Sequence, residues 1–483
     1  MKKLLFLIGI LSSGLYGASI DHIQTYSPDY LSNQAQTGMI DEVSPYYNPA
    51  GLSRLDKGKY VHLGLQLANG HEKMSYKGKE HKAHLTQLIP NVSLTSVDDN
   101  GAYFFTFGGL AGGGKLEYDG VSGIDVLSDL AQFKPLGVYD KGSTLTGKNL
   151  YEQATLGRAF TINDQLSVSV AGRIVHGSRN LSGTLNIGTN PSTAYKQAKV
   201  QQVTQEVSKA VDAATQGSGL SAAQIAAIKQ QKTTQALTLL QTKMNALQQN
   251  GLSGDLDSKR EAWGYGFQIG VNYKVNDKLN LAARYDSRIK MNFKAKGSEN
   301  QLQTADIIGS NIGLSTFYPQ YTINSKIRRD LPAILSVGAS YKVTDNYLVS
   351  TSANYYFNRH AKMDRVTTFG GHEHGRDYKN GWEIALGNEY KLNDKFTLIG
   401  SVNYARTGAK NSSFNDTEYA LNSVTLGAGL RYKYDDTLSI TGSVAHFIYD
   451  KEDGNFKEKY KVNDNQKYHK EITAFGLSVT KKF

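Results

Sequence analysis

The stretch WGYGFQIGVNYKV, residues 263–275, alternates without interruption between apolar positions and polar or glycine positions. A period of two places all the apolar side chains on one face of a β-strand. That face starts at Trp263 and carries aromatic residues near both ends, whereas the other face carries glycines, Gln268, Asn272 and Lys274. An apolar face with aromatic ends and a polar opposite face is typical of strands that separate lipid from a polar lumen.

Alternation of this kind recurs through most of the chain, most clearly at 335–343, 382–392, 424–434 and 470–483. Consecutive segments are joined by short turns rich in Asn and Asp, which tolerate left-handed backbone and hydrogen-bond nearby amides. The six turns lie at 98–101, 163–165, 276–278, 344–346, 393–395 and 435–437. Because outer-membrane barrels keep short turns at the periplasmic end, these turns predict roughly fourteen strands if both chain ends are periplasmic.

The sequence therefore predicts an all-β protein, a transmembrane antiparallel barrel. The expected strands are 59–69, 84–97, 101–118, 149–161, 165–177, 261–275, 278–293, 330–343, 346–358, 379–392, 395–407, 419–434, 437–449 and 470–483. The third strand is the least regular, because glycines weaken pairing and mark kinks or bulges. These glycines are Gly108, Gly109, Gly112, Gly113 and Gly114.

The two ends of the chain indicate export to the outer membrane. Residues 1–17 combine Lys2 and Lys3, a short apolar run and small residues, the pattern of a cleaved signal peptide. At the other end, Phe483 completes an alternating strand that we expect the barrel assembly machinery to recognise. Residues 18–57 precede the first strand and are expected to form a plug, or hatch, inside the lumen of the barrel at 58–483.

Composition excludes several classes of protein and site. The 483 residues include no cysteine, so neither disulfides nor thiolate metal sites are possible. The net charge of +11 is scattered rather than striped, which favours contact with anionic lipid or lipopolysaccharide over nucleic acid. We expect a monomer without cofactor or metal. The motif His372-Glu373-His374 lacks the helical spacing of a zinc protease, so we assign it no metal.

One long insertion does not follow the strand pattern. Residues 192–250 are rich in Gln, Ala, Lys and Thr, and 220–249 shows apolar residues at helical spacing. We therefore expect helices on an extracellular loop at about 178–260.

The motif Asn48-Pro49-Ala50-Gly51 precedes the first strand, with Asn48 suited to cap a helix and Pro49 to its first position. A signal peptide, a short segment, this motif and about fourteen strands together resemble the FadL-type outer-membrane transport family. Pro90-Asn91 in the second strand and Leu331-Pro332 at the eighth strand add to the resemblance.

The resemblance implies passive, ligand-gated uptake of hydrophobic molecules, most often long-chain fatty acids, rather than an enzymatic activity. It also implies that plug movement opens a lateral exit at a kinked third strand, where Gly108–Gly114 lie. A route that avoids the aqueous lumen keeps the apolar chain of the ligand out of water, where exposure would cost about 0.8 kcal/mol per methylene group.

Arg173 is the first candidate partner for a ligand carboxylate, because alternation points its side chain into the lumen. The resemblance to the family adds support, since a loose ungapped match places Arg173 where family members carry an arginine. Arg284 and Arg288 are weaker candidates by the same parity. Alternatively, Arg173 pairs with a structural carboxylate such as Glu383 or Glu389. The extracellular apolar groove would comprise Ile307, Ile308, Ile312, Leu314, Phe317 and Tyr318.

Other functions remain open at this point. A neutral aromatic hydrocarbon would need no lumenal cation, so a pocket without one would favour that ligand. An adhesin or other surface-binding protein would bind through the long loop without moving a solute. A membrane-embedded hydrolase would need a nucleophile constellation that the sequence does not provide.

Overall fold

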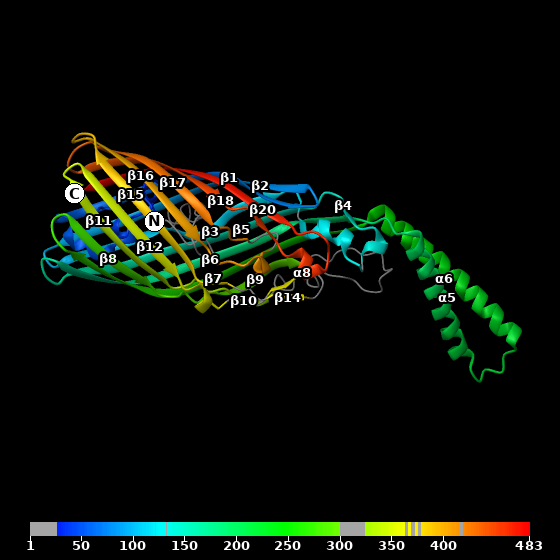
Figure 1. Ribbon diagram of the computed structural model, residues 1–483. Coiled ribbons are helices and arrows are strands. Elements are labelled where there is room, and N and C mark those ends of the chain that lie inside the picture. The colour runs from blue at the N-terminus through cyan, green and yellow to red at the C-terminus, as the bar shows by residue number, and fades with distance from the viewer. Residues whose placement is uncertain are drawn as a thin grey trace.

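The computed structural model describes residues 27–483 apart from residues 121, 132, 300–323, 363–365, 369–371, 375–377 and 415–418. Within them, the chain forms a closed antiparallel barrel of fourteen tilted wall strands (Figure 1). The predicted fold class is confirmed. In chain order the wall strands are β1 (Gly58–Tyr76), β2 (Lys79–Asp98), β3 (Gly101–Tyr118), β5 (Thr144–Thr161), β6 (Leu166–Gly188), β7 (Leu252–Lys274), β8 (Leu279–Asp286), β11 (Ile334–Thr344), β12 (Tyr347–Tyr356), β15 (Gly381–Lys391), β16 (Phe396–Arg406), β17 (Ser423–Lys433), β18 (Leu438–Tyr449) and β20 (Lys467–Lys482).

The first and last wall strands pair with each other and close the barrel. The six predicted turns each join consecutive wall strands. At one of them the Asn163 side-chain oxygen accepts hydrogen bonds from the amides of Gln165 and Leu166. The turns gather with the end of the chain at one end of the barrel, the short-turn end (Figure 1). Barrels of this class place short turns in the periplasm, so the opposite, long-loop end faces the medium.

Side chains alternate across the wall as predicted. In β7 the outward Trp263 and Tyr265 are 62% and 70% exposed, whereas the inward Gln268 and Asn272 are 5% and 0% exposed. The outside of the wall is therefore apolar where it meets lipid, and the inside carries the polar groups.

The hairpin of β1 and β2 extends further toward the medium than predicted. β1 and β2 pair as far as Tyr76↔Lys79, although residues 70–83 were expected to lie between strands. The prediction was wrong here because it depended on outward apolar residues. Beyond the bilayer, outward positions such as Lys73 and Lys82 are polar, and the apolar alternation disappears while backbone pairing continues.

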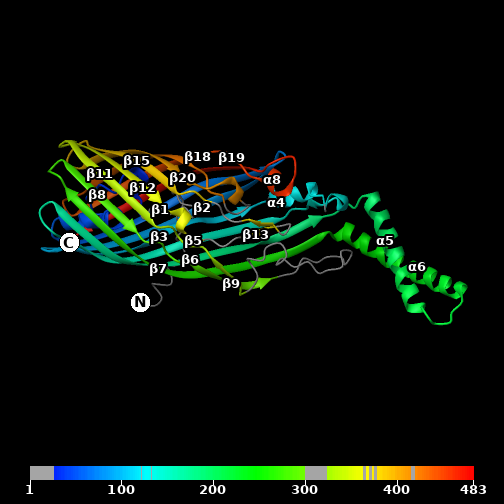
Figure 2. The same ribbon diagram turned by 60° about the horizontal axis from the view of Figure 1, so that its bottom comes forward.

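The insertion forms a helical hairpin that projects from the long-loop end (Figure 1, Figure 2). Its helices are α5 (Thr193–Thr215) and α6 (Ala222–Asn250), and α6 coincides with the stretch 220–249 whose apolar spacing predicted a helix. β6 and β7 remain paired up to Ile187↔Leu252, so the loop is shorter than the expected 178–260. None of the described helices is long and apolar enough to cross a bilayer.

The remaining elements are short. They are α2 (Asp29–Ser32), α3 (Ser44–Tyr47), η1 (Pro49–Arg54), α4 (Ser122–Asp125), η2 (Val126–Asp129), η3 (Lys134–Leu136), β4 (Tyr139–Asp140), β9 (Asn292–Glu299), β10 (Lys326–Arg328), η5 (Asn358–His360), β13 (Val366–Thr368), β14 (His372–His374), η6 (Asn411–Ser413), β19 (Glu452–Asp453) and α8 (Phe456–Tyr460). The expected signal peptide, 1–17, lies outside the described residues.

The described residues 27–57, called the plug below, lie inside the lumen. α2 contacts β16, β17, β18 and β20, whereas η1 contacts β2, β3, β5, β6 and β7 on the other side. The plug thus reaches across the barrel, and most of its side chains are buried.

Candidate functional site

The Asn48-Pro49 motif begins η1 in the manner predicted. The Asn48 side-chain oxygen accepts a hydrogen bond from the amide of Gly51 at 3.3 Å, and Pro49 is the first helical residue. The Asn48 amide group also donates to the Met39 carbonyl at 2.9 Å and to Oδ1 of Asn272 on β7 at 2.8 Å. One buried side chain therefore caps a helix, joins two parts of the plug and fastens the plug to the wall.

Small polar side chains of the lumen hold the plug backbone. Their donated hydrogen bonds run from Ser443 to the carbonyl of Pro28 (2.8 Å), Ser401 to Ser32 (2.7 Å), Asn280 and Ser340 to Gly38 (2.9 and 2.8 Å) and Ser167 to Ala50 (2.7 Å). Carbonyls buried this way need no water. A Cβ at Gly38 would lie 2.3 Å from the backbone of Ala339, so only glycine allows this close approach.

Beside the plug, Arg173 and Arg284 share a buried carboxylate. Arg173 Nη1 lies 3.5 Å from Asp286 Oδ1, and Arg284 Nε lies 3.1 Å from Asp286 Oδ2. Gln153 accepts two further hydrogen bonds from Arg173, at 2.9 and 2.7 Å. Arg284 also donates to the backbone carbonyl of Tyr46 in the plug. Both arginines thus have internal partners, and the carboxylate is neither Glu383 nor Glu389.

Arg288 does not face the lumen, contrary to prediction. Its side chain is 42% exposed, whereas its neighbours Ser287 and Ile289 are buried. β8 ends at Asp286, and two successive buried residues, Asp286 and Ser287, shift the alternation by one position. Parity counted along β8 therefore gives the wrong face beyond this irregularity.

The glycine-rich part of β3 coincides with a break in the wall. β2 and β3 pair from Asp98↔Gly101 to Asn91↔Gly108, and again at His84↔Glu117 and beyond. Residues 85–90 and 109–116, all described, form no register pair across the break. The pairing of β3 with β5 shifts twice between Gly109 and Gly114.

The plug reaches the edge of this break. Asn91, which forms the last β2–β3 pair before the break, donates a hydrogen bond to the hydroxyl of Tyr46 at 2.8 Å. Gly112 and Gly114 have φ of +119° and +71°, conformations that disfavour other residues. A Cβ at Gly113 would meet no atom within 4 Å, so the break borders open space.

A pocket with about 780 Å³ of empty space, part of it open to solvent, adjoins the break. Gly113, Gly114 and Leu116 of β3 belong to its lining. Its charged lining residues comprise five cations and one carboxylate: Lys148, Arg179, Arg260, Arg329, Lys470 and Glu72. Lys470 Nζ lies 2.7 Å from Glu72 Oε1, so the carboxylate is already compensated. The lining side chains therefore carry a net positive formal charge.

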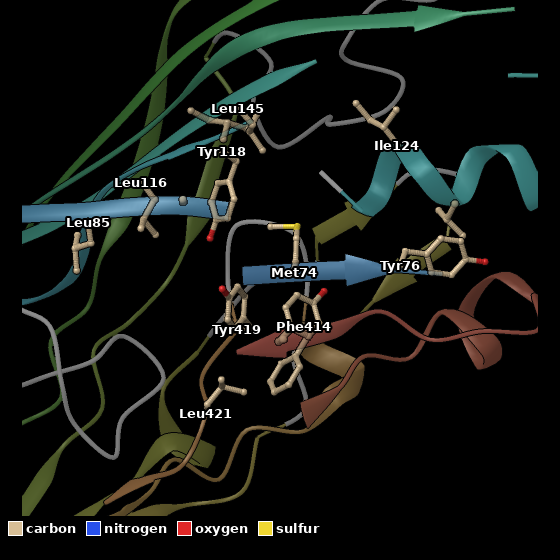
Figure 3. Close-up of a cluster of buried hydrophobic side chains, with 14 of the residues drawn as sticks. Met74, Tyr76, Leu85, Leu116, Tyr118, Ile124, Leu145, Phe414, Tyr419 and Leu421 are labelled. Atoms are coloured by element: carbon tan, nitrogen blue, oxygen red, sulfur yellow. The ribbon is translucent and has the colours of Figure 1, made fainter. Parts of the chain in front are cut away.

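The other side of the pocket is apolar and aromatic. Leu116, Tyr118, Phe414 and Tyr419 line it and belong to a cluster of buried apolar side chains that continues toward the long-loop end (Figure 3). In the close-up, Met74 lies among Tyr118, Phe414 and Tyr419. The pocket thus joins an apolar surface to a set of cations, an arrangement suited to an amphiphilic anion.

The pocket cations were missed in the sequence, although parity gave a usable signal for three of them. Arg179 lies an even number of residues from the inward Arg173, and Arg260 an even number from the inward Gly264, so both point inward. Lys470 lies an odd number of residues from the outward Phe475, so it points inward as well. These positions lie beyond the apolar alternation that defined the strands. Arg329 lies outside the wall strands and had no such signal.

Two predicted features are not placed in a site. The expected groove residues, Ile307 to Tyr318, lie outside the described residues. His372–His374 forms β14, paired with β13. No group of three or more potential metal-ligating His, Cys, Asp or Glu residues was found where the structure describes the chain.

A family model for outer membrane protein transport proteins (OMPP1/FadL/TodX) matches residues 140–483. Outer membrane protein P1 of Haemophilus influenzae is 24% identical over 257 residues, which cover 51% of this chain and 52% of that protein. The long-chain fatty acid transport protein of Escherichia coli O157:H7 is 22% identical over 56% of this chain and 58% of that protein. The alignments thus span about half the length of these relatives.

Solved structures share the fold. A Pseudomonas aeruginosa FadL homologue superposes with a TM-score of 0.65 and 15% identity, over 95% of this chain and 99% of that one. The toluene transporter TodX of P. putida gives a TM-score of 0.59 and 16% identity, over 92% and 94%. Since the family model matches well over half of the chain, this outer-membrane β-barrel belongs to the OMPP1/FadL/TodX family of outer membrane transport proteins.

Proposed function

We propose that this protein is a channel for passive, ligand-gated uptake of hydrophobic carboxylates, with long-chain fatty acids as the best candidates. The observation that carries the proposal is the pocket, in which an apolar aromatic side and several cations meet beside the break between β2 and β3. A fatty acid has the matching two parts, an apolar chain and one carboxylate.

In the proposed mechanism, the acyl chain enters along the apolar cluster at the long-loop end and settles against Phe414 and Tyr419. The carboxylate binds the guanidinium groups of Arg179 and Arg260, which suit carboxylates because their donors form a planar fork. This assignment replaces Arg173 and Arg284, because neither of them lines the pocket.

The exit in this mechanism is sideways, through the break, into the bilayer. Staying beside apolar side chains spares the acyl chain about 0.8 kcal/mol per methylene group that exposure to water would cost. The plug is the gate, because Tyr46 of the plug bonds to Asn91 at the edge of the break. Displacement of the plug would release that edge.

The test is uptake of labelled oleate by cells that lack their own fatty-acid porin. The wild type should restore uptake, and the double variant R179Q/R260Q should lose most of it. A matched control, R158Q, removes a cation from β5 outside the pocket and should transport normally. Equal uptake by the double variant and R158Q would refute the carboxylate assignment.

The lateral exit has its own test. Gly113→Leu should fill the break without a clash, because a Cβ there meets no atom within 4 Å. Oleate uptake should fall while the barrel still assembles. Gly172→Leu also enters open space but lies on β6 away from the break, and it should leave uptake unchanged. Undiminished uptake by the Gly113 variant would argue for a different exit.

A neutral aromatic hydrocarbon is the second candidate ligand, because solved toluene transporters share this fold. The cationic lining of the pocket favours the carboxylate instead. Toluene uptake that survives R179Q/R260Q, together with absent oleate uptake in the wild type, would reverse this choice.

A further inference from the structure

Along residues 288–296, which include the start of β9, the outward face of the wall carries cations instead of apolar side chains. The odd-numbered residues point inward, and Ile289, Met291 and Phe293 are 0%, 0% and 1% exposed. The even-numbered residues are exposed: Arg288, Lys290, Asn292, Lys294 and Lys296. This is the reverse of β7, whose outward face is apolar. A cationic outward face cannot lie in hydrocarbon, so this segment lies beyond the bilayer core.

Strand register places these cations just above the aromatic edge of β7. Lys294 pairs with Glu261 and Lys296 with Lys259, two and four residues beyond the outward Trp263. At a rise of about 3.3 Å per residue, these positions lie roughly 7 and 13 Å from Trp263 along the strand. Exposed Trp and Tyr mark the membrane interface. The cations are therefore level with lipid headgroups.

Neighbouring strands enlarge the cationic surface. Lys326 of β10 lies directly opposite Lys294, and Lys259 lies opposite Lys296. We define the basic ladder by its six exposed cations: Lys259, Arg288, Lys290, Lys294, Lys296 and Lys326. β9 lies beside β7 at the long-loop end in both views (Figure 1, Figure 2).

Few carboxylates among the described residues offset this charge. Glu261 forms an ion pair with Lys296 at 3.1 Å, and the buried Asp330 lies 3.7 Å from Arg288. The exposed Asp257 lies two residues beyond Lys259 on the same face of β7, so these three carboxylates stand against six cations. The ladder thus keeps an excess of positive charge, concentrated on one side of the wall. Like charges held together repel each other, and a polyanionic ligand at the same level would relieve that repulsion.

We propose that the basic ladder binds the phosphates of lipid A, the anchor of outer-leaflet lipopolysaccharide. A bisphosphorylated disaccharide presents two anionic groups at the headgroup level, where several lysines can reach them, while its acyl chains lie against Trp263 and Tyr265. The site lies on the outside of the wall and does not depend on the proposed uptake of fatty acids.

The test uses the full-length protein in detergent micelles and measures binding of bisphosphorylated lipid A by thermophoresis. The variant K294Q/K296Q/K326Q should bind about tenfold more weakly than wild type, since it loses three interfacial charges. The matched control K278Q/K342Q/K395Q has the same charge change at the short-turn end and should bind within about twofold of wild type. Migration with and without heating on gels checks that each barrel is folded.

Lipid A without phosphates and phosphatidylglycerol serve as comparison ligands. Weaker wild-type binding to both supports the proposal. Equal binding of lipid A by the ladder variant and the control variant would overturn it, as would tight binding of the dephosphorylated form. Equal affinity for phosphatidylglycerol would show a general anionic surface and also overturn the assignment. If the triple variant fails to fold, K294Q/K326Q takes its place.

Discussion

Replacing Asn48 by alanine should loosen the plug without disturbing the barrel. The side chain donates to the Met39 carbonyl at 2.9 Å and to Asn272 at 2.8 Å, and it accepts from the amide of Gly51 at 3.3 Å. Asn48 and Asn272 are 2% and 0% exposed, so water does not easily replace these bonds. The plug therefore loses a cap, an internal bond and a wall contact together.

The magnitude follows from ordinary hydrogen-bond energetics. A neutral hydrogen bond contributes about 1 kcal/mol net, and loss of a helix cap costs about 1 kcal/mol. Because Asn272 keeps a hydrogen bond with Asn280, the free energy of plug docking should weaken by only about 2 to 3 kcal/mol. Each 1.4 kcal/mol changes an equilibrium constant about tenfold. The equilibrium between docked and displaced plug should therefore shift by between one and two orders of magnitude.

Hydrogen–deuterium exchange of the protein in lipid nanodiscs measures this shift directly. Peptides covering residues 44–57 should exchange faster by that factor, whereas strand peptides should not change. Ser53→Ala is the matched control, because Ser53 bonds only to Ala50 within the same short helix among the described residues. Wild-type exchange in the Asn48 variant, or equal loosening by Ser53→Ala, would refute the assigned role of Asn48.

Three further predictions concern parts of the molecule outside the motif. Asp286→Asn leaves Arg173 and Arg284 buried without their shared carboxylate, which should destabilise the barrel by about 3 kcal/mol or more; urea unfolding should show this loss, and Asp277→Asn, an exposed turn variant, should not. Replacing residues 200–239 by a short Gly-Ser linker should leave barrel assembly and oleate uptake intact, because the base of the hairpin, including the buried Leu247, remains; failure of heat-modifiable migration would contradict a separable hairpin. Burial opposes ionisation of Asp129, but hydrogen bonds from Lys77 and Tyr76 outweigh it and lower the pKa of this loop carboxyl below 3.8. A lowered pKa means that the ionised Asp129 stabilises the contact with Tyr76 and Lys77 above about pH 4 and loses that effect as the pH falls further. Limited acid proteolysis near Asp129 should therefore increase below about pH 4 in the wild type but not in Asp129→Asn.

The strands, their turns and the cap at Asn48 were predictable because local rules determine them. Alternation of apolar and polar residues predicts which side chains of a strand point outward, Asn and Asp predict turns, and an Asn-Pro pair predicts the start of a helix. Each of these patterns spans only a few residues of sequence. The same rules failed at 70–83, where outward residues become polar beyond the bilayer, and at Arg288, where one irregularity reverses the faces.

The sequence by itself determined the class of barrel, its strand order and the presence of an N-terminal segment that the lumen must hold. Only the tertiary structure decided which charges meet. Arg173 could be placed in the lumen from parity, but its partner Asp286 lies on another strand, and their pairing depends on the stagger between strands. The pocket likewise collects Arg179, Lys470 and Phe414 from distant parts of the chain. Closure of the barrel brings such residues together, and no local pattern records which ones will be neighbours.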